Sequence, residues 1–166
     1  MPLRRLIVLT GFVLAVAAVS PAAVLGKAGG TDRPVRGTSS STAAINIATG
    51  SGTNDGTGQA THLGKFTSHD DFTSFAIIGS TFSFTGTETD VAANGDVLFS
   101  TFTGSGAFTS STTSEIAAVQ TVTGGTGRFA DASGTLTSTI RGTTVSIVGS
   151  TVTTRNTFTT QGRISY

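Results

Sequence analysis

From residue 42 onward, short runs of β-branched and aromatic residues recur between turn-forming residues, and no window repeats apolar residues at helical spacing. Thr and Ser together make up about a third of the chain, whereas charged residues make up 11%. Branched side chains such as Thr and Val pack well on a pleated sheet and favour strands. The sequence therefore predicts an all-β protein.

We expect nine strand-like runs, at 42–49, 59–67, 72–79, 80–91, 96–109, 112–123, 133–142, 144–154 and 156–165. Turn-forming residues separate them, at 50–58, 68–71, 94–95, 110–111, 124–127, 142 and 155–156. Seven to nine short strands at this spacing fit either a barrel or a sandwich. Residues 29–41 show no apolar periodicity and are interpreted as a flexible lead-in, which leaves a single domain over 42–166.

The hairpin around Asn94 and Gly95 allows two registers. A two-residue loop would place its aromatic residues on opposite faces of the sheet. A three-residue loop with Gly95 in the left-handed region pairs Ala92 with Asp96 instead. It places five apolar side chains on one face: Phe82, Phe84, Leu98, Phe102 and Phe108. Because a one-residue slip moves every side chain to the other face, burial favours this second register.

The same register places Glu88 on the aromatic face, opposite Ser100. A carboxylate on such a face often has a raised pKa, which suits general acid–base chemistry. Alternatively, Glu88 and Asp90 line the open end of a barrel and are solvated. Three glycines share this face and leave volume there: Gly86, which gives the Phe102 ring room, Gly104 and Gly106. We therefore expect a modest apolar cavity with Glu88 and Asp90 at its mouth.

The N-terminus has the pattern of an export signal. Arg4 and Arg5 precede an apolar run of fourteen residues from Leu6 to Val19, which is shorter than the roughly 20 residues of a membrane span. Small residues suited to cleavage follow, ending at Ala22 or at Ala28. The sequence predicts a signal peptide within 1–28, cleavage near 22–28, a secreted extracellular protein and no membrane span after cleavage. An uncleaved anchor is the alternative.

Charge and cysteine content exclude several classes of function. Cleavage would leave a net charge of −1 or −2, without the basic field that nucleic-acid binding requires. The chain has no Cys, so disulfides, Cys-ligated zinc and thiolate catalysis are excluded. The Gly-x-Gly patterns are not followed by an amphipathic helix, and no nucleotide or other cofactor is expected. His69 and its acidic neighbours suit a turn between strands better than a metal site.

The run from Gly124 to Gly134, GGTGRFADASG, resembles the Gly-Gly-Thr-Gly-basic-Phe turn of the allene oxide cyclase and dirigent-protein barrels. The run 59–67 also looks like small secreted bacterial members of that superfamily. Within the turn, Phe129 can plug the end of a core, and glycines allow compact backbone. The turn glycines are Gly124, Gly125, Gly127 and Gly134.

This resemblance implies a single antiparallel eight-stranded barrel, often trimeric, with an apolar lumen. Cyclases of the family use a lumenal carboxylate, for which Glu88 is the analogue here. Dirigent proteins place acidic residues and Arg around a pocket for phenolic radicals. Asp90, Arg128 and Arg141 are residues of those types here.

The leading interpretation is a secreted barrel without catalytic activity, which either binds an apolar small molecule in its lumen or serves as a stable extracellular module. Its site would be formed by Phe82, Phe84, Glu88, Leu98, Phe102 and Phe108. An isomerase or cyclase that uses Glu88 on a lipophilic substrate is one alternative. A structural envelope or adhesion module is another, and it requires no cavity.

Overall fold

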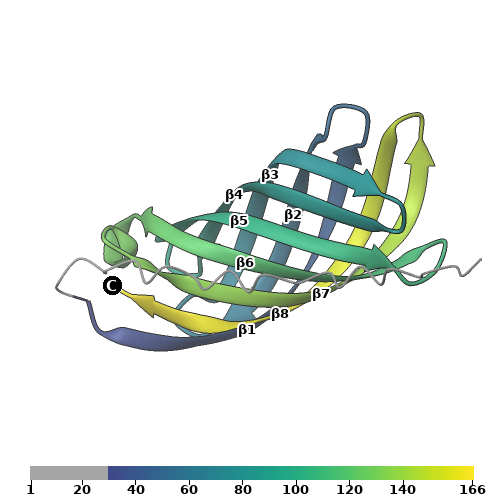
Figure 1. Ribbon diagram of the computed structural model, residues 1–166. Coiled ribbons are helices and arrows are strands. Elements are labelled where there is room, and N and C mark those ends of the chain that lie inside the picture. The colour runs from purple at the N-terminus through teal and green to yellow at the C-terminus, as the bar shows by residue number, and fades with distance from the viewer. Residues whose placement is uncertain (1–29) are drawn as a thin grey trace, which may run out of the picture.

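The computed structural model describes residues 30–166, so the expected signal peptide lies outside the described residues. The chain forms eight strands: β1 (Asp32–Asn46), β2 (Ser51–Ala60), β3 (Gly64–Ile78), β4 (Thr81–Ala92), β5 (Val97–Phe108), β6 (Thr113–Gly125), β7 (Ser133–Val148) and β8 (Thr151–Ser165). A short 3-10 helix, η1 (Gly127–Phe129), lies between β6 and β7. Each strand pairs antiparallel with the next, and β8 pairs with β1 (Figure 1). The predicted all-β, eight-stranded antiparallel barrel is confirmed.

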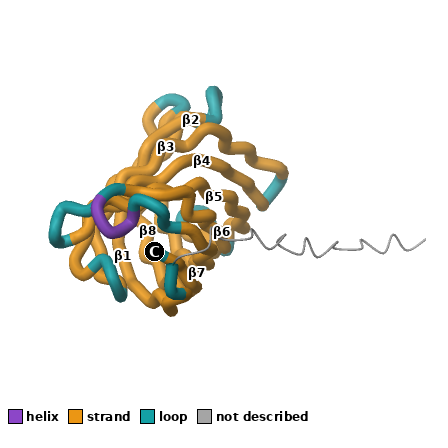
Figure 2. Tube along the Cα trace, turned by 90° about the vertical axis from the view of Figure 1, so that its left-hand side faces the viewer, coloured by secondary structure: helices purple, strands orange, loops and turns teal. Residues whose placement is uncertain are grey.

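The two ends of the barrel differ. At one end, the β2–β3 and β4–β5 turns and η1 lie near the C-terminus, and Figure 2 looks onto this end. Phe129 of η1 is fully buried there, so we call it the plugged end. The four hairpins β1–β2, β3–β4, β5–β6 and β7–β8 lie at the other end, which we call the open end.

Two apolar clusters fill the barrel, one toward each end. The plugged-end cluster contains Val35, Leu63, Ala92, Leu98, Val122, Phe129, Ala132, Leu136 and Ile164. The open-end cluster contains Phe82, Phe84, Phe102, Ala118 and Ile140, with Phe72, Phe75, Ile116 and Phe158 packed against it. Between them the strands turn buried polar side chains inward: Ser41, Asn54, Asp70, Asp90, Ser100, Ser138 and Asn156. The barrel interior is therefore two apolar layers separated by a polar layer.

The expected boundaries are wrong for several strands. The presumed break at 50–58 is mostly β2, and the one at 68–71 lies inside β3. The expected runs 144–154 and 156–165 are redivided, because the chain turns at Gly149 (φ +59°), not at Gly142 or Arg155. The physical reason is that glycines within the strands accommodate neighbouring atoms. A Cβ on Gly58, for example, would lie 2.6 Å from Cζ of Phe66.

The expected flexible lead-in at 29–41 is also wrong from Asp32 onward. These residues form the first ten positions of β1 and pair with β8 from Asp32 opposite Ser165. Their inward residue Val35 is buried in the plugged-end cluster. Most of the inward-facing residues of this segment are small, Gly or Ser. The alternation of apolar and polar residues that marks a strand is therefore absent from its sequence.

The predicted register of the β4–β5 hairpin is confirmed. The Ala92 N–H donates to the Asp96 carbonyl (2.8 Å), and the Gly95 N–H donates to the Ala92 carbonyl (2.9 Å). Gly95 has a φ of +88°, and Gly86 lies opposite Phe102 as expected. The three-residue loop therefore turns Phe82, Phe84 and Phe102 to the interior.

The turn from Gly124 to Gly134 has the expected geometry. Gly124, Gly127 and Gly134 all have positive φ (+140°, +56° and +149°). A Cβ on Gly125 would lie 2.0 Å from the Val97 carbonyl oxygen, so β5 approaches the turn too closely for any other residue. The turn places the Phe129 ring in the plugged-end cluster, against Tyr166 at a centroid distance of 5.0 Å.

We predict that Gly95→Ala lowers the free energy of unfolding by about 1 kcal/mol, because a β-carbon is disfavoured in the left-handed region. No atom lies within 4 Å of the added Cβ, so the cost comes from the backbone alone. Gly95→Asn should cost less, since Asn tolerates this conformation. Urea unfolding measures both variants, and a Gly95→Ala protein as stable as the wild type would contradict the loop geometry.

A cavity with an apolar wall and a polar floor

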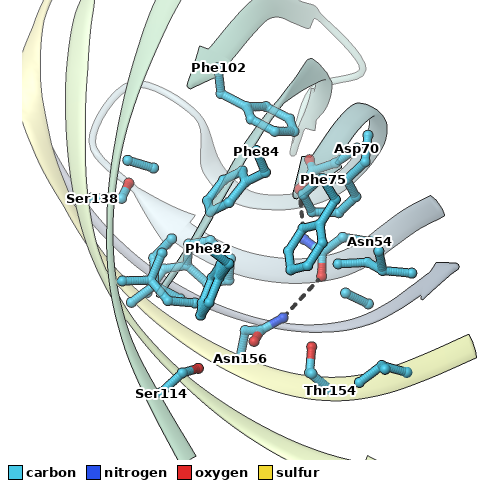
Figure 3. Close-up of a pocket in the computed structure, with 18 of the residues that line it drawn as sticks. Asn54, Asp70, Phe75, Phe82, Phe84, Phe102, Ser114, Ser138, Thr154 and Asn156 are labelled. Atoms are coloured by element: carbon cyan, nitrogen blue, oxygen red, sulfur yellow. Dashed lines mark hydrogen bonds between the residues drawn. The ribbon is translucent and has the colours of Figure 1, made fainter. Parts of the chain in front are cut away.

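A cavity of about 120 Å³ lies inside the open-end half of the barrel. Apolar residues from seven strands line it, together with the polar-layer residues Asn54, Asp70, Ser138 and Asn156 (Figure 3). Its lining includes Phe72, Phe75, Phe82, Phe84, Phe102, Phe108, Ala118, Asn54, Asp70, Glu88 and Gln120. Ile47, Ile77 and Phe108 line it near the hairpins of the open end. The volume suits one aromatic ring or a short alkyl chain, since an apolar cavity of about 150 Å³ can bind benzene.

Three cross-strand pairs of Phe with Gly form the wall made by β4 and β5. Phe82 lies opposite Gly106, Phe84 opposite Gly104, and Phe102 opposite Gly86. A Cβ on Gly104 would lie 2.2 Å from Cζ of Phe84, and one on Gly86 would lie 2.4 Å from Cζ of Phe102. The ring tips therefore occupy the space above the glycines. The expectation that Gly104 and Gly106 contribute open volume is wrong, because phenylalanine rings fill it.

The aromatic rings also pack on one another. Phe72 contacts Phe84 and Phe102 edge to face, with ring centroids 5.7 and 5.4 Å apart. Phe75 stacks on Phe82 at 5.4 Å. Such contacts hold ring orientations, since each pair contributes about 0.5–1.5 kcal/mol beyond area burial. A β-bulge between Phe72 and Ser74 makes this arrangement possible, because it turns both Phe72 and Phe75 inward.

Hydrogen bonds join the polar residues at the cavity floor. The Asn54 amide donates to Oδ2 of Asp70 (2.6 Å), and the Asn156 amide donates to Oδ1 of Asn54 (3.5 Å; Figure 3). Glu88 accepts hydrogen bonds from the Ser100 hydroxyl (3.3 Å) and from the Gln120 amide. A second, smaller space of about 40 Å³ lies on the plugged side of this layer. Asp70 and Glu88 line both spaces, and Asp90 lines only the smaller one.

The environment of the floor favours protonated carboxyl groups. Burial raises the pKa of Asp70 from 3.8 to about 7, with a further contribution from the Glu88 charge and an opposing one from the Asn54 hydrogen bond. Burial also raises the pKa of Glu88, although its hydrogen bonds from Gln120 and Ser100 oppose the shift. The pKa of Asp90 is well above its usual value because of burial and the charges of Glu88 and Asp70.

The structure brings together five of the six predicted lumen residues. Phe82, Phe84, Glu88, Phe102 and Phe108 line the cavity, whereas Leu98 belongs to the plugged-end cluster. Glu88 and Asp90 do not lie at the mouth, and Glu88 is part of the floor. The reason is that β4 begins and β5 ends at the open end. Phe82 and Phe108 therefore lie near the mouth, and Glu88 lies farther along β4, away from it.

Sequence reasoning missed Asp70, Asn54, Gln120 and Asn156 as floor residues. Asp70 lies in the run Ser68 to Asp71, which resembles a turn but is a strand, so its neighbours alternate between faces. His69 points outward and contacts Asp55 (2.6 Å) and Asp71 (3.6 Å). Within residues 30–166, no group of three or more His, Cys, Asp or Glu side chains is arranged to hold a metal ion.

Arg128 and Arg141 do not contribute to the cavity. The Arg128 guanidinium donates to the His62 carbonyl (2.5 Å) and lies 3.5 Å from Asp96, at the plugged end. Arg141 is exposed and lies 3.6 Å from Glu115. The structure therefore separates both arginines from the aromatic wall.

Compared with models of protein families, with curated proteins and with solved structures, the chain matches none of them. In the part of the chain that the structure describes, no helix is long and apolar enough to cross a membrane. The resemblance to the allene oxide cyclase and dirigent barrels thus rests on the 124–134 turn, the run 59–67 and the strand rhythm.

We predict that the free energy of unfolding decreases as pH rises from about 4 to 7. In the unfolded chain Asp70 loses its proton near pH 3.8, whereas in the folded protein it keeps it to about pH 7. Within this window the folded state binds more protons, so raising the pH favours unfolding, by up to about 1.4 kcal/mol per pH unit for each such group. Raised pKa values of Glu88 and Asp90 act in the same direction.

Urea unfolding at pH 5 and pH 8 measures this decrease. Asp70→Asn should make it smaller, whereas Glu115→Gln, which changes an exposed carboxylate, should leave it unchanged. His69 adds to the decrease in the wild type and in both variants, because its hydrogen bond to the Asp55 carboxylate raises its pKa. Stability that rises between pH 5 and pH 8, or an unchanged decrease in Asp70→Asn, would show that Asp70 is not protonated in the folded protein.

Proposed function

We propose that this protein binds a small apolar molecule in the lumen of its barrel. The observation that carries the proposal is the cavity of about 120 Å³, walled by Phe82, Phe84 and Phe102 and open at one end. Binding sites for small molecules are concave and mostly apolar, with a few polar groups that fix orientation. The floor of Asn54, Asp70, Glu88 and Gln120 supplies such groups.

The open end is suited to the entry of an apolar molecule. Its hairpins expose aliphatic and aromatic side chains: Ile47, Ile77, Ile78, Phe108, Val145, Ile147 and Val148. No charged residue occurs in 43–54, 72–87, 97–114 or 142–154, which contain the four hairpins of this end. Farther along β6, β7 and β8, the charged residues Glu115, Arg141 and Arg155 are exposed on the outside of the barrel. A ligand that enters here therefore contacts uncharged residues, most of them apolar, from the mouth to the wall.

The cavity favours binding over a purely structural role. Empty apolar volume destabilises a fold, at about 24 cal/mol per Å³ in a well-studied series of core variants. A structural module would gain stability if larger side chains replaced Ala43 and Ala118, which are buried at the cavity wall. Their small size keeps the lumen open at a cost that ligand binding would explain.

A second candidate is an isomerase or cyclase that acts on a lipophilic molecule in the same lumen. Its supporting observation is Glu88, a floor carboxyl whose pKa is raised by burial and which could exchange a proton with a bound molecule. The two candidates differ in one respect. Catalysis requires the Glu88 proton, whereas binding requires only the shape of the cavity.

Export is part of the proposal and is supported by the sequence alone. Arg4 and Arg5, the apolar run that follows them and the small residues near Ala22 and Ala28 form the signal pattern. A secreted barrel without Cys relies on its core and strand ladder for stability, and about 140 residues can supply both.

We predict that indole binds to the wild-type protein and that Ala118→Leu weakens this binding at least tenfold. Ala118 is buried in the cavity wall, so the larger side chain takes space from the ligand. The chain has no Trp, and the fluorescence of indole can therefore be followed without a protein background of that type. A titration should show a blue shift in emission as indole leaves water.

The matched control is Ala117→Leu. Ala117 is the adjacent residue of β6 and is exposed on the outer face, so the same substitution adds the same volume outside the lumen. Indole should bind to this variant as to the wild type. Absence of binding to the wild type, or equal weakening by both variants, would contradict binding in the lumen.

A further inference from the structure

The floor of the cavity carries three carboxyl groups that face one another across β3 and β4. Asp70 lies directly opposite Glu88 in the strand pairing, and Asp90 follows Glu88 two residues along the same face. Asp70 and Asp90 are 7% and 8% exposed. Three acidic side chains are thus held together in the interior of one small barrel.

No cationic side chain accompanies this group. Among residues 30–166, those that line the two spaces around the floor include no Lys, Arg or His. His69 and Asp55, which also influence Asp70, lie on the outer surface of the barrel. Buried carboxylates in proteins are normally paired with a positive charge or coordinate a metal. Among residues 30–166, no cationic side chain lines the two spaces around these carboxyl groups, and no cluster of side chains is arranged to hold a metal there.

Two carboxyl oxygens of the group also lack a hydrogen-bond donor. Oδ1 of Asp70 and Oδ1 of Asp90 are buried, and no described group of the protein donates to either. A buried acceptor without a partner costs about 1–3 kcal/mol, so each such atom calls for an explanation. Asp70 also lines the main cavity, so its side chain borders the space that a bound molecule would occupy.

We propose that the ligand is a small amphiphile whose apolar body packs against Phe82, Phe84 and Phe102 and whose protonated amino group is held by Asp70 and Glu88. This inference rests on the proposed function and specifies its ligand class. An ammonium group has three donors and a positive charge, and it matches a floor that offers acceptors and no cation. A carboxylate head group would find no cation at this floor and would be repelled by any floor carboxyl group that is ionised.

Binding of such a ligand changes the protonation of the floor. Where Asp70 is protonated, the ammonium form of the ligand binds and the Asp70 proton leaves to solvent, which produces an ammonium–carboxylate pair. The ligand keeps its three N–H bonds, and the only bond broken is the O–H of Asp70. At pH 6, below the Asp70 pKa of about 7, amine binding should therefore release protons, whereas binding of a neutral alcohol should not.

The test compares three ligands with the same alkyl chain: octylamine, octan-1-ol and octanoate. Isothermal titration calorimetry at pH 6, in two buffers of different ionisation enthalpy, gives affinity and proton release together. Octylamine should bind at least tenfold more tightly than octan-1-ol, release protons, and exceed octanoate by a larger factor. Equal affinity for the three ligands, tighter binding of octanoate, or amine binding without proton release would overturn the proposal.

Two variants locate the effect. The double substitution Asp70→Asn and Glu88→Gln keeps the side-chain shapes, so it should remove the preference for octylamine while octan-1-ol still binds. Asp71→Asn changes the outward neighbour of Asp70 and should keep the preference. Retained preference in the double variant would overturn the role of the floor. Binding of octan-1-ol to that variant shows that its barrel is folded.

The outcomes separate this inference from the function on which it rests. If indole and octan-1-ol bind and octylamine has no advantage, the ligand class is wrong and lumenal binding stands. If none of the probes binds, both proposals are wrong.

Discussion

The pairing of phenylalanine with glycine across β4 and β5 is the interaction on which the interior of this barrel depends. Three large rings face one half of a narrow lumen, and they would fill it if each faced a side chain of ordinary size. Glycine on the opposite strand lets the ring tip of Phe84 or Phe102 approach the sheet itself. Volume is thereby moved from the centre of the barrel to its wall, and a cavity remains.

The polar layer depends on the same arrangement. Because the aromatic rings are held near the wall, the floor residues Asp70 and Glu88 border a space instead of a packed core. Their burial is unfavourable to the charged forms and raises their pKa values, from which we expect the stability of the fold to depend on pH. Phe129 closes the opposite end, so the cavity has one mouth and a chemically distinct base.

The sequence predicts those parts of the structure that are determined by residues close together in the chain. In the β4–β5 hairpin, alternation and the loop at Gly95 defined the register, and with it the faces of Phe82, Phe102 and Glu88. The floor could not be predicted in this way. Asp70 follows Ser68 and His69, a composition typical of turns, and it faces inward only because β3 continues through them to pair with β4.

Glycine explains the other differences. In β2 the closely spaced glycines were interpreted as a turn, but Gly58 faces Phe66 on the next strand, where only a hydrogen atom fits. A glycine that makes room for a distant ring and a glycine that reverses the chain look the same in a single sequence. The end of the barrel at which the cavity opens was predicted wrongly for a related reason. The closed end is determined by Phe129, which is far along the chain from β4.

The most direct test of the central claim is a crystal structure of the protein under xenon pressure, since xenon occupies apolar cavities without requiring a particular head group. Our account predicts a xenon atom in the lumen beside Phe84 and Phe102, with their rings still over Gly104 and Gly86. A lumen without xenon, in which these rings have swung inward and filled the space above Asp70 and Glu88, would contradict it.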